Sequence, residues 1–282
     1  MSNVTDFTVR SADGTTIGAE RVGAGPPVVL IGGAFNDRTT TRALAQVLAP
    51  AFTAVSYDRR GRGTSGDEAA PAFAVAREID DLAALVAELG GDAGSGSGSG
   101  DEPAVALFGH SSGAILALEA AAAGVPTRRL ALYEAPYVID DGTRDVPADD
   151  LFEQVTAAVA AGDHEGAVEL FLVEGVGVPA GALGMIRGDD ETWSTMIGLA
   201  HTLPYDVAVC GRANALPADR LGALRVPTLA LDGGESPPWF HNAMAAVAAT
   251  VPGARYVTIP GQDHGILAHP ETMADELTGF LS

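Results

Sequence analysis

The chain has 282 residues and a formal net charge of −21, from 37 acidic and 16 basic side chains, and every basic one is arginine. So large an acidic excess repels polyanions, which excludes nucleic acid and an acidic membrane surface as partners. The length suits one α/β domain with an insertion, and the single cysteine, Cys210, excludes an internal disulfide and a thiolate metal cluster.

Residues 1–10 lack the charged start and the apolar run of a secretory signal. No later stretch is apolar for long enough to span a bilayer. We therefore expect a cytoplasmic protein that has no membrane partner and exists as a monomer or a homodimer.

The first half of the chain alternates short apolar runs with helical patterns. Asp13-Gly14 between two alternating stretches predicts a hairpin at the edge of a sheet. Val28–Ile31 is apolar without a break, as in a strand buried on both faces. Helices that cross between such strands predict an α/β fold with a mostly parallel, doubly wound sheet. The expected strands are 7–10, 16–21, 28–31 and 53–57, and the expected helices are 40–48 and 75–89, the second ended by Gly90.

A glycine and serine segment, Gly94–Gly100, predicts a flexible surface linker to the next strand. That strand, 104–108, is separated from a helix former, 114–123, by Gly109–Gly113, which has the form G-x-S-x-G. A serine between two glycines at a strand-to-helix junction sits on a tight turn that exposes its hydroxyl. The junction therefore predicts that Ser111 is a nucleophile.

A serine nucleophile needs a base, which is usually a histidine oriented by a carboxylate. His264 follows a short predicted strand, 255–259, near the end of the chain. Its place on a loop just past a strand distinguishes it from the other five histidines, and we predict that it is the base.

The developing oxyanion also needs two amide donors, one from the residue after the serine and one from a loop after an early strand. Ser112 is the expected first donor. The apolar run Val28–Ile31 ends in Gly32-Gly33-Ala34-Phe35, so the amide of Ala34 is the expected second donor.

These residues together resemble the α/β-hydrolase superfamily over nearly the whole chain. The segment Tyr57–Ser65 looks like the D-x-R-G-x-G-x-S turn of that family, which is structural there. The family's usual His-Gly before the oxyanion residue stands here as Gly32-Gly33, a departure that removes a side chain and keeps the backbone donor. The resemblance implies a catalytic triad under a helical cap, with no metal and no organic cofactor.

The acid of the triad is ambiguous. In most of the family it follows the strand after the cap, and there this chain has Ser236, with Asp232 and Glu235 nearby but offset. Glu134 instead ends the predicted strand after the helix of the serine, a position that carries the acid in some relatives. We favour Glu134, with Asp232 as the first alternative and Glu235 as the second.

Between residues 136 and 225 the strand pattern stops, and helices are expected at 149–161, 164–173 and 191–200. A helical insertion between two strands is typical of a cap that excludes water from the serine. The predicted division is a core of residues 1–135 and 226–282 and a cap of residues 136–225. The side chains expected to line a substrate pocket are Phe35, Met185, Trp193 and Met196.

The sequence thus predicts a serine hydrolase that cleaves a neutral, fairly apolar ester or lactone through an acyl-enzyme. Two alternatives stay open because one fold hosts many functions. One is a non-hydrolytic enzyme of a natural-product pathway that cleaves a C–C bond or forms a ring. The other is a non-catalytic module that binds a small ligand.

Overall fold

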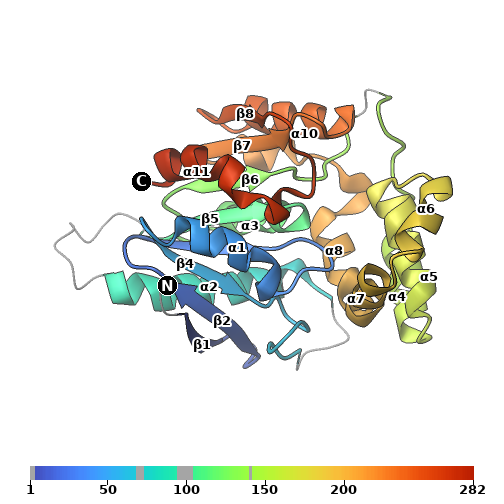
Figure 1. Ribbon diagram of the computed structural model, residues 1–282, viewed down its shortest axis with the longest axis horizontal. Coiled ribbons are helices and arrows are strands. Elements are labelled where there is room, and N and C mark those ends of the chain that lie inside the picture. The colour runs from blue at the N-terminus through green and yellow to red at the C-terminus, as the bar shows by residue number, and fades with distance from the viewer. Residues whose placement is uncertain (1–3, 68–72, 94–103, 140–141) are drawn as a thin grey trace.

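The computed structural model describes residues 4–67, 73–93, 104–139 and 142–282. Its centre is an eight-stranded sheet in the order β1-β2-β4-β3-β5-β6-β7-β8 (Figure 1). β2 pairs antiparallel with β1 and β4, and the other described pairings are parallel. The strands are β1 (Thr5–Arg10), β2 (Thr16–Val22), β3 (Pro27–Ile31), β4 (Thr53–Tyr57), β5 (Ala106–His110), β6 (Leu130–Tyr133), β7 (Thr228–Gly233) and β8 (Arg255–Ile259).

Helices cover both faces of this sheet, which confirms the predicted fold class (Figure 1). The central strands β3, β5 and β6 are buried along their whole length, which explains why their sequences are unbroken apolar runs. One face carries α1 (Arg38–Leu48) and α11 (Ala274–Leu281), and the other carries α2 (Val75–Ala93), α3 (Ser112–Ala122) and α10 (Pro238–Thr250). Two short helices, η4 (Ile266–Ala268) and η5 (Pro270–Met273), precede α11.

Two local expectations differ in outcome. The hairpin at Asp13-Gly14 joins β1 to β2, with Arg10 opposite Thr16. The helix expected to end at Gly90 continues through Gly90 and Gly91 to Ala93, because each glycine costs a helix only about 1 kcal/mol relative to alanine. The expected linker, Gly94–Gly100, lies outside the described residues.

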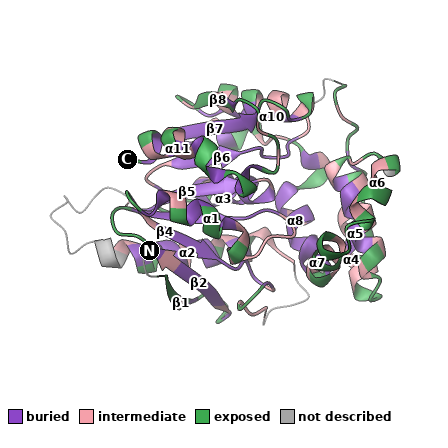
Figure 2. Cartoon of the chain, viewed as in Figure 1, coloured by how far each residue is buried: buried purple, intermediate pink, exposed green. Residues whose placement is uncertain are grey.

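The described residues between 136 and 225, called the helical insertion below, join β6 to β7. Their outer helices α6 and α7 carry mostly exposed side chains, whereas the central strands are buried (Figure 2). The helices are α4 (Leu151–Ala160), α5 (His164–Leu170), η1 (Phe171–Val176), α6 (Ala180–Arg187), α7 (Asp190–Leu199), η2 (Ala200–Thr202), α8 (Leu203–Cys210), η3 (Arg212–Asn214) and α9 (Ala218–Leu221).

The helical insertion has an apolar core of its own, in which Val155, Val168 and Leu203 are fully buried. Its two ends meet at a single parallel bridge between Val138 and Ala215. Residues of the insertion line the same cavity as Ser111, which follows β5, and His264, which follows β8, so the insertion lies over the carboxyl ends of these parallel strands. Within the described ranges, no helix combines the length and the hydropathy needed to cross a bilayer.

Candidate active site

Ser111 occupies the turn between β5 and α3 with a φ of 57° and a ψ of −128°. A non-glycine residue at positive φ is strained, and such strain concentrates at functional sites. The Ser111 amide donates to the carbonyl of Tyr133 at 2.9 Å, which fixes the turn to β6. Since α3 begins at the next residue, the hydroxyl lies at the positive end of the helix dipole.

Close backbone approaches explain the glycines around this turn. A Cβ atom on Gly109 would lie 2.4 Å from the carbonyl oxygen of Gly113, and one on Gly113 would lie 2.4 Å from that of Ile31. A Cβ atom on Gly33 would lie 2.7 Å from the Cβ of Ser111. The elbow and the loop after β3 thus touch without intervening side chains.

The two expected oxyanion donors, Ala34 and Ser112, both line the cavity that contains Ser111. In the described part of the chain, neither backbone N–H group donates to a protein acceptor. Amide donors without a protein partner beside a nucleophile can bind an oxyanion. The turn that carries Ala34 is closed by Asn36, whose Oδ1 atom accepts from the Gly33 amide at 3.0 Å.

Glu134 is the carboxylate that the structure places against His264. Its Oε2 atom accepts a hydrogen bond of 2.6 Å from Nδ1 of His264. Its Oε1 atom accepts from the Gly233 amide at 2.8 Å and from the Ser236 hydroxyl at 2.5 Å. Ser236 thus binds the carboxylate of Glu134, the residue that directly follows β6.

The two alternative acids lie elsewhere. Asp232 is fully buried, and its Oδ2 atom accepts from Nδ1 of His241 at 2.9 Å and from the Tyr256 hydroxyl. Glu235 is exposed. Neither carboxylate contacts His264, so Glu134 is the acid candidate whose geometry fits.

The loop that carries His264 is held by two side chains from the central strands. Nε2 of His110 donates to the His264 carbonyl at 2.9 Å, and the Tyr133 hydroxyl donates to the Asp263 carbonyl at 2.8 Å. The ring of Phe240 stacks on the His264 ring at 4.6 Å between centroids. The ring of His264 is thus held at Nδ1 and on one face, and the backbone of its loop is held by two further hydrogen bonds.

His110 is neutral in this arrangement. Burial lowers its pKa to about 3, and the nearby His264 ring acts in the same direction. A neutral ring that donates through Nε2 has no proton on Nδ1, and Nδ1 of His110 is buried without a partner in the described part of the chain.

Ser111 and His264 lie in a cavity of about 730 Å³ between the sheet and the helical insertion, a volume typical of small-molecule sites. Most of its wall is apolar. The side chains that enclose it include Phe35, Leu151, Phe171, Leu172, Val176, Met196, Val207, Trp239, Phe240 and Leu267.

Of the four expected pocket residues, the structure brings Phe35 and Met196 to this wall. The other two do not line this cavity. Met185 is 76% exposed on α6, and Trp193 packs under the guanidinium of Arg187, 5.2 Å from its ring centroid. Trp193 packs against the apolar core of the insertion, on the same helix as Met196 but turned away from the cavity, and Met185 lies outside that core.

Two aromatic pocket residues, Trp239 and Phe240, lie on α10 and were not expected from the sequence. They follow Pro237-Pro238, which sets the start of α10 next to the end of β7. The signal that could have found them is their place just after a strand end, where α/β sheets bind ligands.

The Tyr57–Ser65 motif forms a turn around the Asp58 carboxylate. Oδ1 of Asp58 accepts from the Arg38 amide at 2.8 Å and Oδ2 from the Thr64 amide at 2.8 Å. This is the structural role that the sequence predicts for the motif. Within the described ranges, no cluster of three or more His, Cys, Asp or Glu side chains is placed to hold a metal ion.

Comparison with known proteins agrees with this architecture. Residues 28–276 match the model of the "Alpha/beta hydrolase family". The chain is similar to the solved structure of an alpha/beta hydrolase from Sphaerobacter thermophilus, at 44% identity and a TM-score of 0.86, over 98% of this chain and 100% of that one. No curated protein matches the chain at a significant level.

Two further solved structures are more distant. One is an esterase from a Rhodococcus species, at 22% identity and a TM-score of 0.68, over 98% of each chain. The other is a thermophilic esterase from Thermogutta terrifontis, at 22% identity and a TM-score of 0.71, over 98% of each chain. At this identity the two likenesses show a shared fold alone.

Proposed function

Since this chain belongs to the alpha/beta hydrolase family, we propose that it is a serine hydrolase that cleaves neutral, fairly apolar esters or lactones through an acyl-enzyme. The observation that carries the proposal is the arrangement around Ser111. A strained serine at a helix start, two unpaired amides, and a histidine bonded to a buried carboxylate meet at one cavity.

In the proposed mechanism His264 removes the proton of Ser111 as the hydroxyl attacks the substrate carbonyl. Glu134 orients the ring and stabilises the imidazolium that forms. The amides of Ala34 and Ser112 bind the oxyanion. His264 then protonates the leaving alcohol and activates the water that hydrolyses the acyl-enzyme.

The cavity wall supports the choice of substrate. Its apolar side chains suit an apolar acyl or alcohol group and give a charged one no compensation for lost hydration. The only ionisable side chains that reach the wall in the described ranges are two histidines, Glu191 and Cys210. Two solved structures that share the fold are esterases, and an ester is accordingly one of the two substrate classes in the proposal.

A panel of chromogenic esters and lactones of graded size tests the proposal, with the wild-type protein measured beside Ser111→Ala. We expect turnover of apolar esters or lactones by the wild type and a loss of several decades in kcat in the variant, since removal of a triad serine costs about 10⁶-fold. Ser194→Ala, an exposed serine of α7, is the matched control and keeps full activity. No turnover of any member of the panel, or an active Ser111→Ala, would overturn the proposal.

A further inference from the structure

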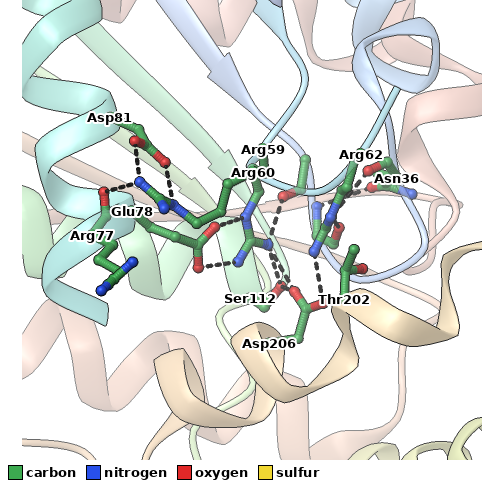
Figure 3. Close-up of polar contacts among 12 residues, drawn as sticks. Asn36, Arg59, Arg60, Arg62, Arg77, Glu78, Asp81, Ser112, Thr202 and Asp206 are labelled. Atoms are coloured by element: carbon green, nitrogen blue, oxygen red, sulfur yellow. Dashed lines mark hydrogen bonds and ion pairs between the residues drawn. The ribbon is translucent and has the colours of Figure 1, made fainter. Parts of the chain in front are cut away.

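Four charged side chains are buried beneath the elbow, and we call them the buried ion cluster: Arg59, Glu78, Arg62 and Asp206. Their side chains are at most 2% exposed. Two cations and two anions make the cluster neutral overall. Figure 3 shows that three of its members come from the core of the fold and the fourth, Asp206, from the helical insertion.

Arg59 connects this cluster to the elbow. Its Nε and Nη2 atoms donate to the two carboxylate oxygens of Glu78 at 2.7 and 2.8 Å. Its Nη1 atom points the other way and donates to the Ser112 hydroxyl at 3.2 Å, to the Gly32 carbonyl at 3.3 Å and to Oδ1 of Asp206 at 2.7 Å. Glu78 thus holds the guanidinium in the orientation that reaches the elbow.

Arg62 connects the cluster to the loop after β3. Its Nη1 atom donates to the Gly33 carbonyl at 2.6 Å and to the Asn36 carbonyl at 2.9 Å (Figure 3). The Gly33 carbonyl belongs to the same peptide unit as the Ala34 N–H group. In a planar trans peptide the two groups point in opposite directions, so a donor on the carbonyl fixes where the N–H points. It also polarises the N–H group.

Asp206 joins these two halves. Its Oδ1 atom accepts from the Ser112 hydroxyl at 2.7 Å, and its Oδ2 atom accepts from Nη2 of Arg62 at 2.7 Å. One carboxylate is therefore bonded both to the residue that supplies one oxyanion donor and to the arginine that holds the peptide of the other. Burial opposes ionisation of Asp206, but the charges of Arg62 and Arg59 outweigh it and lower the pKa of this carboxyl.

We propose that Asp206 is a positioning residue through which the helical insertion sets the geometry of the oxyanion hole. The inference rests on the proposed function, because it assigns the amides of Ala34 and Ser112 to the transition state. Asp206 touches no substrate and acts through Ser112 and Arg62. The insertion therefore contributes to the rate of the reaction as well as to the shape of the cavity.

The variant Asp206→Asn, which replaces the carboxylate by an amide, tests this. The NH₂ group of the amide would face a guanidinium donor of Arg62 or of Arg59, and the cluster would carry an uncompensated positive charge. Displacing preorganised donors slows the reaction without weakening ground-state binding. We expect Asp206→Asn to lower kcat by about 10- to 100-fold and to change KM by less than about threefold.

Two inhibitors separate positioning from a general structural role. The carbonyl carbon of a trifluoromethyl ketone shaped like the best ester is attacked by the Ser111 hydroxyl, whose proton passes to His264. The carbonyl oxygen of the resulting hemiketal is then an oxyanion that lies in the hole. The matching ether fills the cavity and forms no oxyanion. In Asp206→Asn the inhibition constant of the ketone should rise in proportion to the loss of kcat, and that of the ether should stay within about twofold.

Asp149→Asn is the matched control, because Asp149 lies in the same insertion and also pairs with an arginine, Arg212, but on the surface. Its kcat and both inhibition constants should equal those of the wild type. If Asp206→Asn does not fold, Arg62→Lys replaces it, since an ammonium cannot reproduce the planar fork that reaches Gly33 and Asp206 together.

Unchanged kcat in a folded Asp206→Asn or Arg62→Lys, or equal weakening of ketone and ether, would overturn the inference. If Ser111→Ala is inactive under the same conditions, such a result leaves the proposed function standing. An active Ser111→Ala would overturn the proposed function and this inference with it.

Discussion

His264 and Glu134 are joined by a hydrogen bond of 2.6 Å, although 130 residues separate them in the sequence. Glu134→Gln should keep the fold and lower kcat by about three to four decades, because an amide can hold the ring in the wrong tautomer. Steady-state kinetics together with a thermal melt measure both effects.

Asp232→Asn is the control for this variant, because Asp232 is also fully buried and also bonded to a histidine, His241. It should affect stability far more than kcat. The assignment of the acid would be reversed if Asp232→Asn lost turnover and Glu134→Gln kept it.

The pH profile of kcat/KM tests the role of His264. A protonated imidazole cannot accept the proton of Ser111, so kcat/KM should fall as the pH is lowered. His241→Asn should show the same acid limb as the wild type, because His241 lies on α10 against Asp232. If the acid limb disappeared in His241→Asn, the base would be His241 and not His264.

His110 should make the fold sensitive to acid. Its pKa is about 3 in the folded protein and about 6.5 when unfolded, so between these values only the unfolded chain binds the proton. Stability is therefore unaffected by this group above pH 6.5 and is lost as the pH falls below it, by up to about 1.4 kcal/mol per pH unit.

Urea unfolding of the wild type and of His110→Gln at pH 7, 6 and 5 measures this linkage. The glutamine cannot titrate, and its amide can donate to the His264 carbonyl as the ring does. The stability of the wild type relative to the variant should decline from pH 7 to pH 5. A difference that does not change with pH would mean that the buried ring carries no such penalty.

Two methionines of the helical insertion test the cavity wall. Met196→Ala should lower kcat/KM for a long-chain ester by about tenfold, because the acyl chain loses an apolar contact. The same variant should change kcat/KM for an acetate ester by less than about twofold. Met185→Ala, at a side chain 76% exposed, should change neither. Equal effects of Met196→Ala on both esters would remove it from the substrate pocket.

The fold could be predicted because each signal was local. Unbroken apolar runs such as Val28–Ile31 occur where a strand is buried on both faces, and Asp13-Gly14 closes a two-stranded edge. The placement of Glu134 beside His264 follows from the strand order, because β6, β7 and β8 are parallel neighbours and bring their carboxyl ends to one edge of the sheet, with Glu134 directly after β6 and His264 on the loop after β8. The catalytic roles of these residues stay predictions.

Other parts of the site depend on packing between distant segments. The apolar neighbours of Asp206 in Leu203–Cys210 indicate a buried helix but not the partner of its carboxylate, because the contact that defines it joins it to Ser112 across 94 residues. Trp193 and Met196 are both large apolar side chains on the same helix, and only the way α7 packs decides that Met196 reaches the cavity. Periodicity fixes which residues share a face of a helix and not what that face meets.

The central claim is that Ser111 is the nucleophile, and active-site labelling tests it most directly. The protein is treated with a fluorophosphonate, digested, and mapped by mass spectrometry, with Ser111→Ala carried through the same steps. The account predicts a single phosphonylated peptide with the adduct on Ser111, and no adduct in the variant. An adduct on Ser112 or on any other side chain, or labelling that persists in Ser111→Ala, would contradict it.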